Sequence, residues 1–179
     1  MAEDRLKIVV FGSFNAGKSS FIQALDPHSR HIEASSDDGP TTVALDFGRL
    51  KVNGRAVYLF GTPGQERFEF VRQIISRGMD GAIIMVDATK AVDAITRDLY
   101  LRLKTLEVPL AFMANKCDCP DAMPDAICRD LPGEMVFPIS ALNSEDVHAA
   151  LETFVETLSP GVANILCPRV ATSLHTIDP

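Results

Sequence analysis

Residues 12–19, GSFNAGKS, fit the pattern G-x-x-x-x-G-K-[ST] of a phosphate-binding loop. A short apolar run at residues 6–11 precedes the loop, and residues 20–25 follow it with helical spacing of their apolar side chains. Strand, loop and helix in this order let backbone N–H groups converge on phosphate oxygens at a helix N-terminus. We therefore expect a nucleoside triphosphate site, rather than a glycine-rich turn that only joins a strand to a helix.

Two side chains of this loop have expected roles. Lys18 should reach the β- and γ-phosphates, and the hydroxyl of Ser19 should coordinate Mg²⁺. The nucleotide-binding residues predicted in the loop are Asn15, Ala16, Gly17, Lys18, Ser19 and Ser20.

A second motif, NKCD at residues 115–118, selects the base. It follows an apolar run at residues 108–114, so it lies at the carboxyl edge of the predicted sheet, where open α/β sheets bind ligands. The Asp118 carboxylate can accept from the N1–H and the exocyclic amine of guanine, whereas adenine would leave it unpaired. The alternative is a polar surface turn, but the order of strand and motif downstream of a phosphate loop favours guanine, as GTP or GDP.

Other residues complete the predicted base site. The Asn115 side chain can tie this loop to the phosphate loop, and the aliphatic stem of Lys116 can cover the base. After the last predicted strand, a backbone N–H should reach the guanine carbonyl from a segment comprising Ser140, Ala141 and Leu142.

Composition excludes several classes of protein. The 179 residues are 46% hydrophobic and carry a net charge of −7, which indicates one globular domain and argues against a nucleic-acid surface or a polybasic membrane anchor. We find no signal peptide, lipidation motif or membrane-spanning run, so we expect a cytoplasmic protein without a direct membrane anchor. Cys117, Cys119, Cys128 and Cys167 lack a usual zinc spacing and are interpreted as reduced thiols.

The remaining elements predict an α/β fold. Strands are expected at residues 43–52 and 55–60, joined by a tight Asn53-Gly54 turn, and further strands at 81–87, 108–114 and 135–138. Helices are expected at about 67–77, 91–106, 120–131 and 144–158, and residues 26–40 read as a long exposed loop. Together with the first strand this predicts a P-loop NTPase fold: a mostly parallel six-stranded sheet, one antiparallel edge strand, and helices on both faces.

With these segments in order, the chain resembles the Ras-like small GTPases over residues 6–158. The resemblance rests on residues 12–19, 64–68 (GQERF), 115–118 and 140–142. It implies a G domain at residues 1–158, followed by a C-terminal extension at 159–179 that is either docked or mobile. It also implies that Thr42, with Thr41 as a fallback, binds Mg²⁺ and the γ-phosphate, and that Gln65 orients the attacking water. An edge-strand threonine and a solvated glutamine are the alternatives.

Two positions depart from the family pattern. Gly61 stands where the family's second switch begins with an aspartate, but Asp46 lies on the paired strand and faces the same edge. Prokaryotic Ras-like proteins, including the polarity-setting GTPases of gliding bacteria, look similar in this respect. Phe14 occupies a loop position where regulated members carry glycine, which implies slow turnover.

The resemblance therefore implies a small regulatory GTPase that uses GTP/GDP and Mg²⁺ as a molecular switch. The expected catalytic residues are Gln65, Lys18 and Thr42, and the expected metal residues are Ser19, Thr42 and Asp46. A protein effector and GTPase-activating or exchange partners are implied as well. The alternatives are a guanine-nucleotide-binding module with little or no turnover and, less favoured, a phosphate-loop kinase acting on a small molecule.

Overall fold

The computed structural model describes residues 4–35, 42–63 and 76–158. Strand β1 (Arg5–Gly12) runs through its centre, and Ile8, Val9 and Val10 are fully buried. A strand buried on both faces has no need of alternating polar residues, which explains its continuous apolar sequence.

The sheet has seven strands in the order β2-β3-β4-β1-β5-β6-β7. Their bounds are β2 (Arg30–Ser35), β3 (Thr42–Val52), β4 (Arg55–Gly61), β1, β5 (Gly81–Asp87), β6 (Leu110–Asn115) and β7 (Met135–Pro138). All neighbours pair in parallel except β3, which is antiparallel to both β2 and β4. The predicted α/β fold with a mostly parallel sheet is confirmed. The predicted number of six strands is wrong, and the antiparallel strand lies second in the sheet and not at its edge.

The additional strand is β2, which lies inside the predicted loop at residues 26–40. Its sequence, RHIEAS, has no apolar run because an edge strand pairs with only one neighbour, and charged residues are typical of such strands. Because residues 26–40 are mostly polar, they were predicted to form a loop, and β2 is recognisable only through its pairing with β3.

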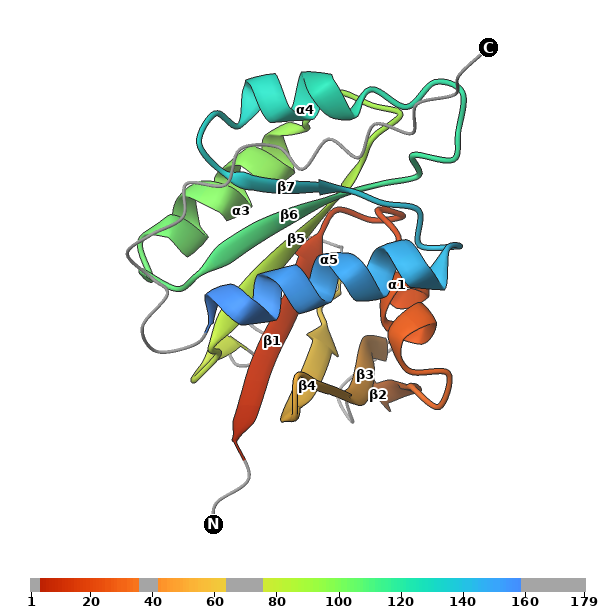
Figure 1. Cartoon of the computed structure of the whole chain (residues 1–179), viewed down its shortest axis with the longest axis vertical. Helices are drawn as coiled ribbons and strands as arrows, with labels where there is room; N and C mark the ends of the chain where they lie inside the picture. The colour runs from red at the N-terminus through yellow and green to blue at the C-terminus, as the bar shows by residue number, and fades with distance from the viewer. Residues whose placement is uncertain (1–3, 36–41, 64–75, 159–179) are drawn as a thin grey trace.

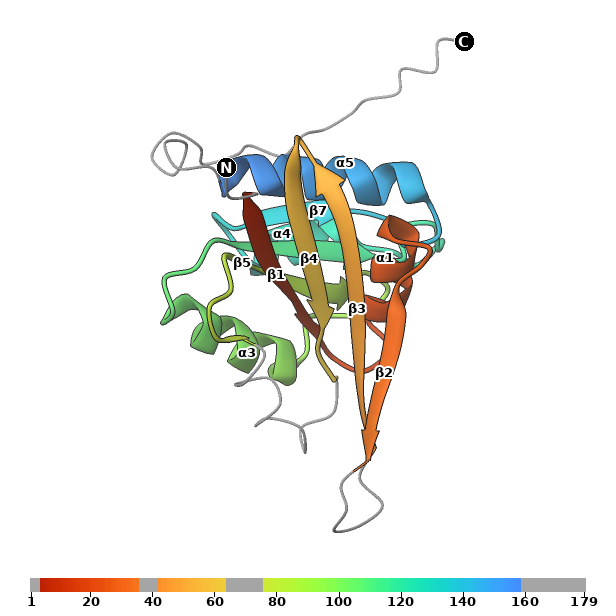
Figure 2. The same cartoon turned by 90° about the horizontal axis from the view of Figure 1, so that it is seen from below.

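Helices cover both faces of the sheet, as predicted. Alternate residues of β1 enter different cores: Ile8 and Val10 pack with α1 (Lys18–Leu25) and α5 (Ser144–Thr157), whereas Val9 and Phe11 pack with α3 (Ala94–Lys104) and α4 (Pro124–Asp130). Figure 1 labels these elements, and Figure 2 shows the sheet between α5 and α3.

Local sequence signals explain where these helices begin. The Asp93 carboxylate caps α3 by accepting a hydrogen bond from the backbone N–H of Thr96 at 2.7 Å. The helix therefore begins at Ala94, three residues later than predicted. Asn143 caps α5 in the same way through the N–H of Glu145, and Pro124 opens α4 at a position where no amide donor is needed. The helix predicted at about 67–77 and the extension at 159–179 lie largely or wholly outside the described residues, so both stay predictions.

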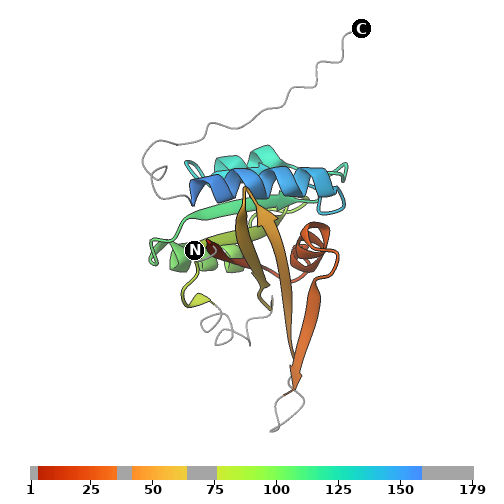
Figure 3. The ribbon, with the colours of Figure 1, turned by 60° about the horizontal axis from the view of Figure 1, so that its bottom comes forward.

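The β3–β4 turn follows the sequence closely. Asn53 and Gly54 have φ values of 50° and 80°, the positive angles that a two-residue hairpin of this hand requires. On the other side of β3, the β2–β3 pair projects beyond the rest of the sheet (Figure 3). Among the described helices, none has the length and apolarity to cross a membrane.

Candidate nucleotide-binding site

The three predicted ligand loops meet at the carboxyl edge of the sheet. Asn115, the last residue of β6, is buried and joins them: its Nδ2 donates to the carbonyl of Ala16 at 3.0 Å. Its Oδ1 accepts from the backbone N–H of Ala141 at 2.8 Å. The tie predicted between Asn115 and the phosphate loop is therefore present, and it extends to the loop after β7.

The phosphate loop needs glycine at two positions. Gly12 and Gly17 have φ values of 141° and 97°. A Cβ at Gly12 would lie 2.5 Å from the carbonyl oxygen of Met85, and one at Gly17 would lie 2.1 Å from Nδ2 of Asn115. The loop can therefore curl against β5 and β6 only because these positions lack side chains.

Lys18 places a positive charge inside this curl. Its Nζ donates to the carbonyls of Gly12 and Ser13 at 2.9 and 2.8 Å, and the residue is only 9% exposed. Helix α1 begins at Lys18, and among the described residues no side chain caps its N-terminus. Uncapped N–H groups next to a buried ammonium form a site suited to phosphate.

Ser19 contacts a carboxylate from another strand. Its hydroxyl donates to Oδ2 of Asp46 at 2.6 Å. Asp46 lies opposite Gly61 in the β3–β4 register, and a Cβ at Gly61 would lie 3.1 Å from Cβ of Asp46. The Asp46 side chain thus occupies the space into which a residue at position 61 would project. A hydroxyl and a carboxylate beside a phosphate loop are oxygen donors of the kind that Mg²⁺ prefers, so these residues fit that ion.

Asp46 has a second partner that the sequence did not reveal. Nδ1 of His31, on β2, lies 2.7 Å from Oδ1 of Asp46. The pair could be recognised only from the pairing of β2 with β3, which places His31 opposite Asp46, and β2 was not predicted. Thr42 is the first residue of β3, while Thr41 and Gln65 lie outside the described residues. The metal, γ-phosphate and water-orienting roles of these three residues stay predictions.

A hollow of about 380 Å³ lies between the loop after β6 and the loop after β7, where the base is expected. Its lining includes Asp118, Ser140 and Leu142 from the predicted base loops. Asp118 is exposed, so its carboxylate is accessible to a ligand. The amide of Ala141 is donated to Asn115, and that of Leu142 lies 3.3 Å from Oγ of Ser140. The Leu142 N–H is therefore in the longer and weaker bond of the two, and the predicted contact of this segment with a guanine carbonyl stays a prediction.

Lys116 is held by an ion pair at the same edge. Its φ is 70°, and its Nζ lies 2.6 Å from Oδ2 of Asp87, at the end of β5. Burial raises the pKa of Asp87, but hydrogen bonds from Lys116 and Thr89 outweigh burial and leave that pKa below its ordinary value of 3.8. The ion pair thereby holds the end of the Lys116 side chain at Asp87.

The three cysteines that the structure describes form no metal site. Cys117, Cys119 and Cys128 are free thiols, and burial raises the pKa of Cys117 and of Cys128. Within residues 4–35, 42–63 and 76–158, no group of three or more His, Cys, Asp or Glu side chains is arranged to hold a metal ion. Cys167 lies outside these ranges.

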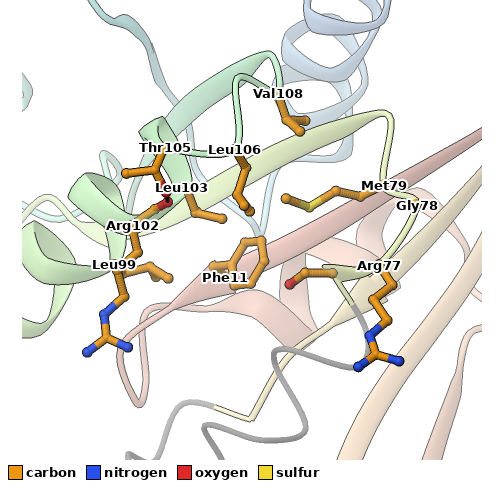
Figure 4. A pocket seen from close by; sticks show the side chains of 11 residues that line it. Phe11, Arg77, Gly78, Met79, Leu99, Arg102, Leu103, Thr105, Leu106 and Val108 are labelled. Atoms are coloured by element: carbon orange, nitrogen blue, oxygen red, sulfur yellow. Dashed lines mark hydrogen bonds between the residues drawn. The ribbon is translucent and has the colours of Figure 1, made fainter.

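A second hollow, of about 530 Å³, lies on the α3 side of the sheet. Figure 4 shows Phe11 facing Leu99, Leu103 and Leu106, with Met79 beside them. None of the predicted site residues lines it, and its lining is mostly apolar. The lining residues that the structure describes include no Asp or Glu that could accept from guanine, whereas the hollow at the base loops is lined by Asp118.

Comparison with known proteins decides the family. Residues 3–160 match the model of the elongation factor Tu GTP binding domain. The chain belongs to this family. It is therefore a GTP-binding G domain with the P-loop NTPase fold, from a family whose members are generally GTPases and bind GTP or GDP, typically with Mg²⁺. The match does not single out the Ras-like branch to which the motifs were compared.

Two relatives of this G domain are similar to it in sequence. It is 31% identical over 121 residues to the uncharacterized protein MJ1339 of Methanocaldococcus jannaschii, covering 68% of this chain and 76% of that protein. It is 29% identical over 156 residues to translation initiation factor IF-2 of Alkaliphilus oremlandii, covering 81% of this chain but only 21% of the factor. The chain thus spans about a fifth of that factor's length.

Solved structures show the same fold. The G domain of the T. maritima FeoB iron transporter superposes with a TM-score of 0.66 at 21% identity, covering 87% of this chain and 99% of that one. The apo cytosolic domain of T. maritima FeoB gives 0.67 at 20% identity, covering 87% and 65% of the respective chains.

Proposed function

We propose that this G domain hydrolyses GTP slowly to GDP and phosphate and acts in the cytoplasm as a molecular switch. The observation that carries the proposal is the hydrogen bond between Ser19 and Asp46. Gly61 alone would suggest a degenerate enzyme, since it lacks the carboxylate expected at that position. Asp46 offers a carboxylate in the same space, so the chain keeps an acidic group beside the Ser19 hydroxyl.

The chain's own groups suit phosphoryl transfer, which depends mainly on positioning and electrostatics. Lys18 and the loop amides would neutralise the developing charge on the phosphate oxygens. Ser19 and Thr42 would hold Mg²⁺ directly, with Asp46 acting through the serine hydroxyl or through water; the bound ion would add positive charge beside the phosphates. Gln65 would place the attacking water.

Base recognition would depend on the loops joined by Asn115. Asp118 would accept from the two guanine donors, and Lys116, held by Asp87, would cover one face of the base. A switch role further implies a protein effector and activating or exchange partners. The net charge of −7 gives no support to a nucleic-acid partner.

A guanine-nucleotide-binding module with little or no turnover is the second candidate. Phe14 favours it, because this bulky ring is 67% exposed on the phosphate loop, where it can obstruct an approaching catalytic group. A small-molecule kinase is less favoured, since it would leave Asp118 and the loop at residues 140–142 without a purpose.

Single-turnover hydrolysis separates the two candidates. The protein is loaded with GTP and phosphate release is followed for the wild type, for Gln65→Leu, and for Gln23→Leu as a matched exposed control. We expect Gln65→Leu to slow the reaction roughly 10- to 100-fold, because the water loses its orientation, and Gln23→Leu to have no effect. A wild type that releases no phosphate would identify a binding module, whereas release at the same rate in the wild type and in Gln65→Leu would remove Gln65 from the reaction.

A further inference from the structure

A row of three residues crosses the sheet beside the phosphate loop. In the strand registers, His31 on β2 lies opposite Asp46 on β3, and Asp46 lies opposite Gly61 on β4. Directly opposite residues project from the same face of a sheet. That face is the one covered by α1, because a Cβ at Gly61 would lie 2.9 Å from Cδ1 of Ile22. His31 and Asp46 therefore share the face on which Ser19 lies.

Both oxygens of Asp46 are engaged. Oδ2 accepts from the Ser19 hydroxyl at 2.6 Å, and Oδ1 lies 2.7 Å from Nδ1 of His31. A carboxylate only accepts, so Nδ1 is the donor. The side chain of His31 is 52% exposed, compared with 17% for Asp46. The imidazole is therefore not part of the core, and its Nδ1 is in hydrogen-bonding contact with Asp46.

The arrangement determines how Ser19 presents its oxygen. A serine hydroxyl that ligates a cation does so through a lone pair, so its proton must be directed elsewhere. Asp46 accepts a hydrogen bond from the Ser19 hydroxyl and so directs that proton away from the cation. A carboxylate held at only one oxygen can rotate about Cβ–Cγ and lose this alignment, whereas a donor on each oxygen fixes it.

We propose that His31 is a positioning residue of the magnesium site, which holds Asp46 so that Ser19 presents its lone pairs to the ion. This inference rests on the metal role given to Asp46 in the proposed function. It adds β2 to that site, since the edge strand supplies the second anchor of the carboxylate. If the pair only joined two strands, its loss would lower stability and leave Mg²⁺ binding unchanged.

Three variants test the role of His31. His31→Ala removes the donor, and His31→Asn restores one, because the asparagine Nδ2 is as many bonds from Cα as Nδ1 of histidine. His28→Ala is the control, an exposed histidine in the connection before β2. The readout is the Mg²⁺ concentration that half-maximally slows release of a fluorescent GDP analogue, with thermal unfolding measured alongside.

We expect His31→Ala to raise that Mg²⁺ concentration roughly 3- to 10-fold, less than removal of a direct partner of a ligand. His31→Asn should stay within about 2-fold of the wild type, and His28→Ala should match the wild type. In an Asp46→Ala background, His31→Ala should add no further shift, because the side chain it positions is gone.

Three results would overturn the role of His31 and leave the proposed function intact. The first is a shift of the half-maximal Mg²⁺ concentration in Asp46→Ala but not in His31→Ala. The others are an equal shift by His31→Ala in the wild-type and Asp46→Ala backgrounds, or a His31→Asn variant that does not restore the wild-type Mg²⁺ dependence. A lower unfolding temperature at unchanged Mg²⁺ dependence would assign His31 to strand pairing only. If Asp46→Ala itself left Mg²⁺ dependence unchanged, the metal role of Asp46 would fail and this inference with it.

Discussion

The side chain of Asn115 donates to the carbonyl of Ala16, 3.0 Å away and 99 residues earlier in the chain. The same side chain accepts from the N–H of Ala141 at 2.8 Å. Both contacts are between buried protein groups, so the phosphate loop and the base loops are joined through one amide. Residues that bind different parts of a nucleotide thus form a single structural unit.

Asn115→Ala should weaken both folding and nucleotide binding. The substitution leaves the Ala16 carbonyl and the Ala141 N–H without their partner, and each unpaired buried group costs about 1–3 kcal/mol. Urea denaturation and GDP titration are the measurements. Asp93→Ala is the control, since this carboxylate caps α3 through the N–H of Thr96 and not through a loop residue, and the change should lower stability by ~1 kcal/mol with GDP affinity unchanged. Retained GDP affinity in Asn115→Ala would contradict the role of the amide.

Asp118→Asn should change base preference. The amide replaces an acceptor-only carboxylate, so it cannot accept from both guanine donors but can donate to the second carbonyl of xanthine. We expect GDP affinity to fall roughly 10- to 150-fold and XDP affinity to rise. Titrations of labelled GDP and XDP test this, with Asp121→Asn as the exposed neighbouring control. An undiminished preference for GDP would remove Asp118 from the base site.

Gly61→Ala should destabilise the fold by crowding. Its Cβ would lie 2.9 Å from Cδ1 of Ile22 and 3.1 Å from Cβ of Asp46, and overpacking of this kind costs about 1–3 kcal/mol. Ile22→Val removes that Cδ1, so the added cost of Gly61→Ala should shrink in the Ile22→Val background. Gly48→Ala is the matched control, because its Cβ would meet Cγ2 of Ile22 at 2.8 Å, an atom that valine keeps. Urea denaturation of the single and double variants measures each effect; equal costs of Gly61→Ala in both backgrounds would refute the crowding.

Asp87 should contribute to stability in a pH-dependent way. Its folded pKa lies below the ordinary value of 3.8, because hydrogen bonds from Lys116 and Thr89 outweigh burial. The contribution is therefore fully present above the unfolded pKa and is lost as the pH falls through the lower folded pKa. Free energies of unfolding from neutral pH to about pH 3 should fall less steeply in Asp87→Asn than in the wild type. Asp98→Asn, which alters an exposed pair with Arg102, is the control, and an acid slope in Asp87→Asn equal to that of the wild type would contradict the prediction.

The sequence was most informative where chemistry and backbone geometry demand particular residues. The glycines of the phosphate loop, the Asn53-Gly54 turn and the buried strands were all recognisable, since each position excludes most other side chains. Strand β2 was not, because an edge strand with polar residues is defined by its pairing with β3 and not by local propensity.

Cross-strand relationships limited the prediction of the site. Asp46 was expected near Gly61 from hairpin pairing, and the register confirms that placement. His31 could not be found, since its contact depends on a strand that was not predicted. The hydrogen bond from the Ala141 N–H to Asn115 could also be recognised only in the structure, because the motif gives residue types and not the direction of each N–H.

The shared space of residues 46 and 61 also constrains how such a chain can diverge. An aspartate added at position 61 would meet Ile22 and the Asp46 side chain, and would bring two like charges together. We expect the carboxylate to move between β3 and β4 during evolution through ancestors with no acid at either position, and seldom through ancestors with both.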